Sequence, residues 1–123
     1  MISLYLVFLI LFAHYFGDFI LQTNEMTINK SKSFLFLIDH ILMYMIGIFV
    51  ILIIPAALGL FKAEIIIIWT ILNGSIHFII DFFTSKVARK FRQKENKHNF
   101  FIVIGFDQLL HLIILLLTFK LLT

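Results

Sequence analysis

Residues 63–84 read AEIIIIWTILNGSIHFIIDFFT, an apolar stretch long enough to cross a membrane as one helix. The stretch nevertheless carries a histidine, His77, and an aspartate, Asp81, four residues apart. Residues with this spacing lie one turn apart on the same face of an α-helix. Ionisable groups inside a membrane span face the protein interior, because contact with lipid is costly. The stretch therefore predicts a membrane helix that contributes two polar groups to a buried site.

The composition of the whole chain indicates the same class of protein. Of its 123 residues, 62% are hydrophobic and 14% are charged, and the mean hydropathy is +1.08. Soluble domains carry about 25% charged residues. The absence of cysteine excludes a disulfide scaffold and a thiolate metal site. We expect an all-α integral membrane protein.

Apolar stretches predict three spans besides residues 63–84. The four expected spans are residues 3–21, 34–54, 63–84 and 100–122. Pro55 is expected to end the second span, because proline interrupts the helical hydrogen bonds. No segment has the composition of a linker or a second domain. The sequence thus predicts a single domain, residues 1–123, with four transmembrane helices in one bundle.

Basic residues predict the orientation of this bundle. The first and third connections hold eight of the ten lysines and arginines, and the other side has only Lys62 and Lys120. By the positive-inside rule, these two connections are cytoplasmic and both termini are outside, in a bacterial inner membrane. The third connection has two interpretations: a topology signal on anionic headgroups, or a docking site for an acidic partner or anionic substrate. It is too short to suggest nucleic acid as a partner.

The acids and histidines are distributed in pairs, one pair in each predicted span. Three of the pairs have a spacing of four residues, and in the predicted topology all eight side chains lie in the cytoplasmic half of the membrane. A single shared polar site explains this distribution better than four separate ones. The pairs are His14 and Asp18, Asp39 and His40, His77 and Asp81, and Asp107 and His111.

A divalent metal ion suits these side chains. Carboxylates that lie close together repel one another, and imidazole with carboxylate is a standard ligand set for Zn, Mn or Fe. All eight paired residues are candidate ligands, and Asp18 and Asp107 are also candidate catalytic groups. Protonated acids or histidines are the alternative to a metal. Three further residues are candidates for orienting the ligands or binding substrate, or alternatively for joining helices to one another: Gln22, Asn73 and Gln108.

The order of these motifs resembles a known family. Four motifs together resemble the SatE-like family of small bacterial membrane proteins. They are the stretch from His14 to Gln22 (HYFGDFILQ), the pair Asp39-His40, the stretch from His77 to Asp81 (HFIID) and the stretch from Asp107 to His111 (DQLLH). This resemblance implies an architecture rather than an activity.

A more distant resemblance covers one helix. Gly74 to Thr84 is similar to a Gly-x-x-His-x-x-x-Asp-x-x-Thr run of the YdjM-type membrane-bound metal-dependent hydrolases. This resemblance implies that His77 and Asp81 are metal ligands, with His40 as a further candidate.

Three functions remain open on the sequence. The first is metal-dependent hydrolysis of a lipid or lipid-linked substrate at the cytoplasmic headgroups. The second is a proton or metal-ion transporter or relay, although the outer half of every span is nearly all apolar. The third is a structural or accessory membrane subunit held together by the same side chains. Expected partners are membrane lipids and a lipid-linked substrate, together with a second copy of the chain or an accessory protein.

Overall fold

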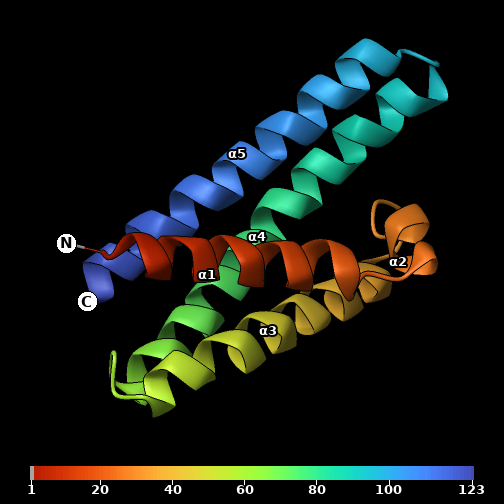
Figure 1. Cartoon of the computed structure of the whole chain (residues 1–123). Helices are drawn as coiled ribbons and strands as arrows, with labels where there is room; N and C mark the ends of the chain where they lie inside the picture. The colour runs from red at the N-terminus through yellow and green to blue at the C-terminus, as the bar shows by residue number, and fades with distance from the viewer. Residues whose placement is uncertain (1) are drawn as a thin grey trace.

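The computed structural model describes residues 2–123, and the regular structure in this range is entirely helical (Figure 1). No strand occurs among these residues. The predicted all-α class is therefore confirmed. In chain order the elements are α1 (Leu4–Tyr15), the π-helical turn η1 (Phe16–Ile20), α2 (Asn24–Asn29), α3 (Phe34–Ala57), α4 (Ala63–Gln93) and α5 (Lys97–Leu122).

Three of these helices are long and apolar enough to cross a membrane. They are α3, α4 and α5, with 24, 31 and 26 residues. The continuous stretch formed by α1 and η1, Leu4–Ile20, is also apolar but shorter. The three long helices fit the expected membrane protein, while a fourth span over residues 3–21 stays a prediction.

The helices form two hairpins, with α1 lying across them (Figure 1). Helices α3 and α4 make the first hairpin, and α4 and α5 make the second. Both termini lie at the same end as the α3–α4 connection, where Ile2, Leu60 and Thr123 line a common cavity. Helix α2 and the α4–α5 connection lie at the opposite end, and the tip of the α4–α5 hairpin extends beyond the other helices.

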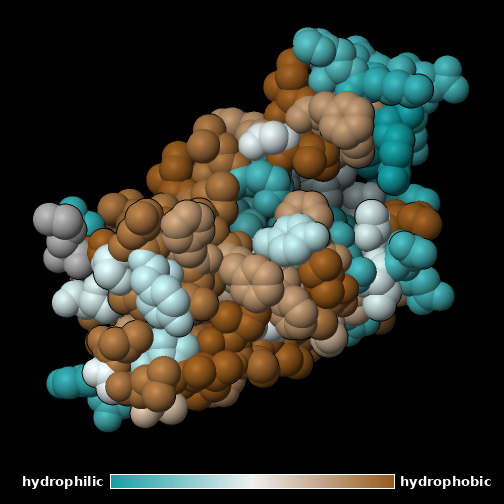
Figure 2. Space-filling view, viewed as in Figure 1, coloured by the Kyte–Doolittle hydropathy of each residue, from teal (hydrophilic) through white to brown (hydrophobic). Residues whose placement is uncertain are grey.

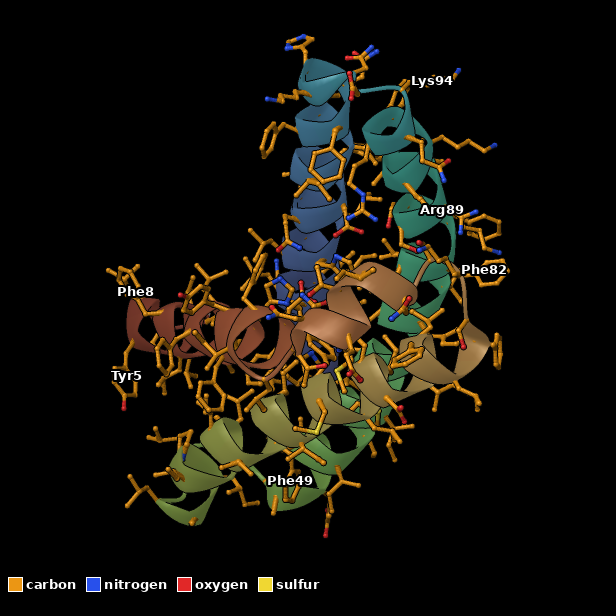
Figure 3. The ribbon with its side chains drawn as sticks, turned by 90° about the vertical axis from the view of Figure 1, so that its right-hand side faces the viewer. Tyr5, Phe8, Phe49, Phe82, Arg89 and Lys94 are labelled. Carbon is orange, nitrogen blue, oxygen red and sulfur yellow. The ribbon has the colours of Figure 1, made fainter. Side chains whose placement is uncertain are left out.

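The interior at the end that holds the termini is closed by apolar side chains. Ile10, Ile48, Trp69 and Leu115 are fully buried in one cluster contributed by α1, α3, α4 and α5. Large apolar residues also cover most of the outer surface (Figure 2). Hydrophilic residues gather at the end formed by α2 and the α4–α5 connection. In Figure 3, Tyr5 and Phe8 project outward from α1, as expected for side chains that contact lipid.

Three local features differ from the sequence expectation. Pro55 lies inside α3, which continues to Ala57, because a proline near the end of a helix removes only one of its hydrogen bonds. Helix α4 continues past the predicted span to Gln93, since lysine, arginine and alanine favour the helical conformation. The first connection contains the short helix α2, whose N-cap is Thr23; the Thr23 hydroxyl accepts a hydrogen bond from the Met26 amide.

Candidate metal centre

The structure gathers most of the predicted acid and histidine pairs into one buried layer. The buried members come from α1, η1, α3, α4 and α5, so all four long segments of the chain contribute. Each of these side chains is at most 7% exposed. They are His14, Asp18, His40, His77, Asp81, Asp107 and His111.

Four of these side chains converge on one point. Nε2 of His40 lies 3.3 Å from Nε2 of His77, and the two nitrogens lie 3.1 and 3.3 Å from Oδ1 of Asp18. Asp81 closes the group, with Oδ2 at 3.2 Å from Nε2 of His40 and Oδ1 at 3.5 Å from Nε2 of His77. We call Asp18, His40, His77 and Asp81 the ligand group. Each residue offers one donor atom to a common metal position.

The spacing within the ligand group fits a tetrahedral metal site. Ligand atoms about 2.0–2.1 Å from a tetrahedral zinc lie roughly 3.3–3.4 Å from one another. The contacts of 3.1–3.5 Å in the ligand group are close to that value, although Asp81 uses Oδ2 toward His40 and Oδ1 toward His77. Two imidazoles and two carboxylates are also a ligand set that Zn, Mn and Fe accept. The residues present therefore fit a divalent cation in number and chemical type, with four donor atoms that lie within 4.8 Å of one another.

A second group of possible ligands shares Asp81 with the first. It consists of Asp81, Asp107 and His111. Nδ1 of His111 lies 2.8 Å from the backbone oxygen of Asp107, and because a carbonyl can only accept, Nδ1 carries the proton. Nε2 of His111 is buried without a hydrogen-bond partner among the described residues, 3.6 Å from Oδ1 of Asp81. An imidazole lone pair beside a carboxylate is stable only with a cation or a proton between them, and metal-ligating histidines commonly donate their other nitrogen to a carbonyl.

Aromatic contacts orient the central imidazole of the ligand group. The His77 ring centroid lies 4.0 Å from that of Tyr44 and 4.0 Å from that of His111. Tyr44 also meets the ring of His14 edge to face at 5.8 Å. Because these rings are buried and in contact, His77 has little freedom to turn away from Asp18.

The backbone around Asp18 departs from the α-helix. The π-helical turn Phe16–Ile20 follows directly after α1. Such turns insert a residue into the helical repeat and change the direction of the side chains that follow. Gly17 and Gly47 allow this turn to lie against α3, because a Cβ on Gly17 would be 2.8 Å from the Tyr44 carbonyl oxygen. A close backbone contact therefore holds Asp18 in place.

Gln108 connects several of the predicted residues. Its Nε2 donates hydrogen bonds to Oδ2 of Asp18 at 2.9 Å and to Oδ2 of Asp107 at 3.1 Å. Its Oε1 accepts a hydrogen bond from Nε2 of His14 at 3.0 Å. Thr84 donates a further hydrogen bond to Oδ1 of Asp107 at 2.5 Å. His14 is not one of the four members, but it contacts them through Gln108 and through its Nε2, 3.8 Å from Oδ2 of Asp18.

Lys30 is a member of the cluster that the sequence analysis did not identify. Its Nζ lies 2.8 Å from Oδ2 of Asp81 and 3.4 Å from Nε2 of His40. Burial opposes the charge of the Lys30 ammonium, but the carboxylates of Asp81 and Asp18 outweigh this effect and raise the pKa of Lys30 above its ordinary value. From the sequence, Lys30 is expected only to contribute to the topology signal. The polar connection that contains Lys30 also contains the exposed Lys32, so its local sequence carries no signal of this contact.

Asn73 takes the helix-joining role, one of the two that the sequence leaves open for it. Its Nδ2 donates to the backbone oxygen of Trp69 at 2.9 Å and to Oγ1 of Thr118 at 3.0 Å. Trp69 also donates to Oγ1 of Thr118, at 2.9 Å. These bonds join α4 to α5, so the structure assigns Asn73 to helix packing and not to the ligand group.

Two other predicted residues lie at the edge of the cluster or outside it. Asp39 is exposed, and the structure does not bring it to the ligand group. Successive residues of a helix point about 100° apart, so Asp39 faces outward where the adjacent His40 faces inward. Gln22 is half-buried, and its Oε1 has no hydrogen-bond partner among the described residues.

A cavity of about 180 Å³ adjoins the cluster. Its lining includes Asp18, Asp107 and Gln108 together with the basic residues Lys30 and Arg89. Figure 3 shows Arg89 on α4, in the part of the helix between Phe82 and Lys94. The cavity therefore links two carboxylates of the buried layer with the basic end of the molecule.

Comparison with known proteins identifies a family. A family model described as "Protein of unknown function (DUF3307)" matches residues 6–123. No curated protein and no solved structure matches the chain. The resemblances to the SatE-like family and to the YdjM-type hydrolases stay predictions, because the description of the matched family names neither.

Proposed function

The chain belongs to the DUF3307 family, and for this member we propose a membrane metalloenzyme that hydrolyses an ester or phosphoester bond of a lipid or lipid-linked substrate. One observation carries the proposal: Asp18, His40, His77 and Asp81 present four buried donor atoms to a common point beside a cavity. Buried acids and imidazoles at such a point are costly unless a cation neutralises them. Zn, Mn or Fe is the proposed occupant.

Asp107 is the proposed general base. Asp107 is not a member of the ligand group, so its carboxylate can act on a water molecule. It also lines the cavity. Hydrogen bonds from Thr84 and Gln108 fix its carboxylate. Asp18 lines the same cavity and is the alternative base if the second group, with Asp81, Asp107 and His111, holds the metal.

The proposed reaction consumes one water molecule. A bound divalent cation would make water more acidic and would polarise the ester. The water oxygen bonds to the carbonyl carbon or to phosphorus, and the bond to the leaving oxygen breaks. Asp107 accepts the proton from water and returns it to the leaving oxygen, so the base is regenerated.

The proposed topology has four spans in one domain, with α1 and η1 as the first. The basic residues support this arrangement, because Lys62 lies at the end that holds the termini while Arg89 and Lys94 lie at the other. With the positive-inside rule, the end formed by α2 and the α4–α5 connection faces the cytoplasm, in a bacterial inner membrane. The cavity then opens near the cytoplasmic headgroups, where lipid-linked substrates are accessible.

Metal content tests the proposal. Elemental mass spectrometry would be applied to the protein purified without chelator and supplemented with Zn, Mn or Fe. We expect about one metal ion per chain in the wild type and none in the variant with His77→Ala and Asp81→Ala. A wild type that binds no metal under these conditions would refute the proposal. The hydrolytic step is tested by headgroup release from phospholipid vesicles, with and without chelator.

A second candidate function is favoured by the position of Lys30. Its ammonium already lies 2.8 Å from Asp81, so Lys30, Asp18, Asp81 and the histidines also form a metal-free ion-pair cluster that joins the helices. In that case Lys30→Met would leave an unpaired buried carboxylate and destabilise the protein by about 3–5 kcal/mol. In the metalloenzyme, Lys30→Met would leave metal binding intact and change stability little.

A further inference from the structure

The cavity beside the ligand group has both acidic and basic side chains in its lining. Asp18 and Asp107 contribute carboxylates. Lys30, Arg89 and Arg92 contribute basic groups, of which the Lys30 ammonium is already paired with Asp81. At about 180 Å³ the cavity is far larger than the ~10–15 Å³ that one water needs, so a polar group of several atoms fits in it.

Several polar atoms around this cavity lack partners. Oε1 of Gln22, Oγ of Ser85 and Nε of Arg89 are buried without a hydrogen-bond partner among the described residues. All three residues line the cavity. Buried polar atoms are normally satisfied, and a cluster of unsatisfied ones indicates a missing ligand or water. Their convergence on one cavity points to a ligand with several polar atoms.

The Arg89 guanidinium is largely unused by the rest of the protein. Its only hydrogen bond among the described residues is a long one, 3.4 Å from Nη1 to the Ser31 backbone oxygen. A guanidinium offers five N–H donors in a planar fork that matches phosphate oxygens two at a time. The Ser85 hydroxyl lies one turn before Arg89 on α4 and can donate to the same ligand.

We propose that this cavity binds the phosphate group of the substrate, with Arg89 and Arg92 as its anion-binding side chains and Ser85 as a hydrogen-bond donor. The inference rests on the proposed function, because the carboxylates of Asp18 and Asp107 would repel an anion unless a bound cation neutralises them. It names the substrate class as a phosphate ester. The bond to be hydrolysed then lies between the basic residues and the metal position.

Binding of two phosphate esters to the metal-loaded protein tests this inference. Calorimetry would use glycerol 3-phosphate as a free phosphate ester and dihexanoyl phosphatidic acid as a lipid headgroup. Arg89→Gln is expected to weaken binding at least tenfold. The matched control is Lys90→Gln, which removes the same charge from the neighbouring exposed residue outside the cavity and is expected to weaken binding less than twofold. Arg92→Gln provides a second variant at an exposed position, with an expected loss of threefold or more.

The outcomes distinguish a free phosphate ester from a lipid headgroup as the ligand, and they test the inference itself. Equal affinity for both probes identifies any phosphate ester as the ligand, and tighter binding of the lipid probe identifies a headgroup. Wild-type affinity in both Arg89→Gln and Arg92→Gln would overturn the inference. Metal content is measured on the same samples. A wild type that retains metal but binds neither probe overturns this inference alone, whereas a wild type without metal overturns the proposed function and this inference together.

Discussion

Gly17 and Gly47 cross with their backbones in contact, since a Cβ built on Gly47 would lie 2.8 Å from Cα of Gly17. No L-side chain fits at either position without movement of a helix. The contact fixes η1 against α3, and Asp18 is the next residue after Gly17. A packing contact between two glycines therefore determines where one member of the ligand group lies.

Gly47→Ala is expected to destabilise the protein by about 1–3 kcal/mol and to lower metal content, because the added methyl group pushes η1 and Asp18 away from α3. Thermal unfolding in detergent, followed by the fluorescence of the single tryptophan, measures the first effect. Gly105→Ala is the control, since a Cβ at Gly105 meets nothing within 4 Å. The control should gain up to about 1 kcal/mol from its higher helix propensity. Equal effects of the two substitutions would contradict this account of the glycine crossing.

Asp81→Asn is expected to abolish metal binding, whereas Asp39→Asn should leave it unchanged. Both substitutions remove one carboxylate from a helix, but Asp81 belongs to both groups of possible ligands and Asp39 is exposed. Metal content per chain, measured on equal amounts of folded protein, gives the comparison. Loss of metal in Asp39→Asn would show that the ligand group is assigned incorrectly.

Added metal is expected to raise the melting temperature of the wild type. A ligand present at 100 times its Kd stabilises the folded state by about 2.7 kcal/mol. The His77→Ala variant should show no shift with the same metal, because it lacks one of the four donors. An identical shift in both proteins would mean that the metal binds elsewhere.

Asn73→Ala and Gln108→Ala are expected to have different effects, because Asn73 joins two helices whereas Gln108 supports the metal site. Asn73 bonds to Thr118 and Trp69, so its loss should cost about 1 kcal/mol of stability with full metal content. Gln108 bonds to Asp18 and Asp107, and its loss should reduce metal affinity about 10–100-fold. Metal titration and thermal unfolding on both variants provide the test. The assignment fails if Asn73→Ala is the variant that loses metal affinity.

The helical class and most of the buried polar residues could be predicted from sequence, because both depend on local spacing. An apolar stretch with His77 and Asp81 one turn apart predicts a membrane helix with a polar face. Asp39 shows the limit of this reasoning. It is adjacent to His40 in sequence, but its side chain points away from the site. Counting the acids and histidines in a predicted span does not show which face of the helix Asp39 or His40 occupies.

Long-range contacts were beyond the reach of sequence patterns. Lys30 reaches Asp81 from a connection 51 residues earlier, and nothing in its local sequence distinguishes it from the exposed Lys32. The π-helical turn at Asp18 likewise depends on the close approach of α3 at Gly47. Asn73 has the right position along α4 to face the site, but the hydroxyl of Thr118 on α5 provides its partner.

The apolar cluster formed by Ile10, Ile48, Trp69 and Leu115 closes the polar layer on the side of the termini. Among the described residues, the cavity that reaches Asp18 and Asp107 lies on the other side, toward α2 and the α4–α5 hairpin. This cavity is thus the route by which the proposed substrate would reach Asp18 and Asp107. Reactant and products would have to pass through the same opening, and a phosphorylated product would occupy the place that the next reactant needs. Such an enzyme would show competitive inhibition by its charged product.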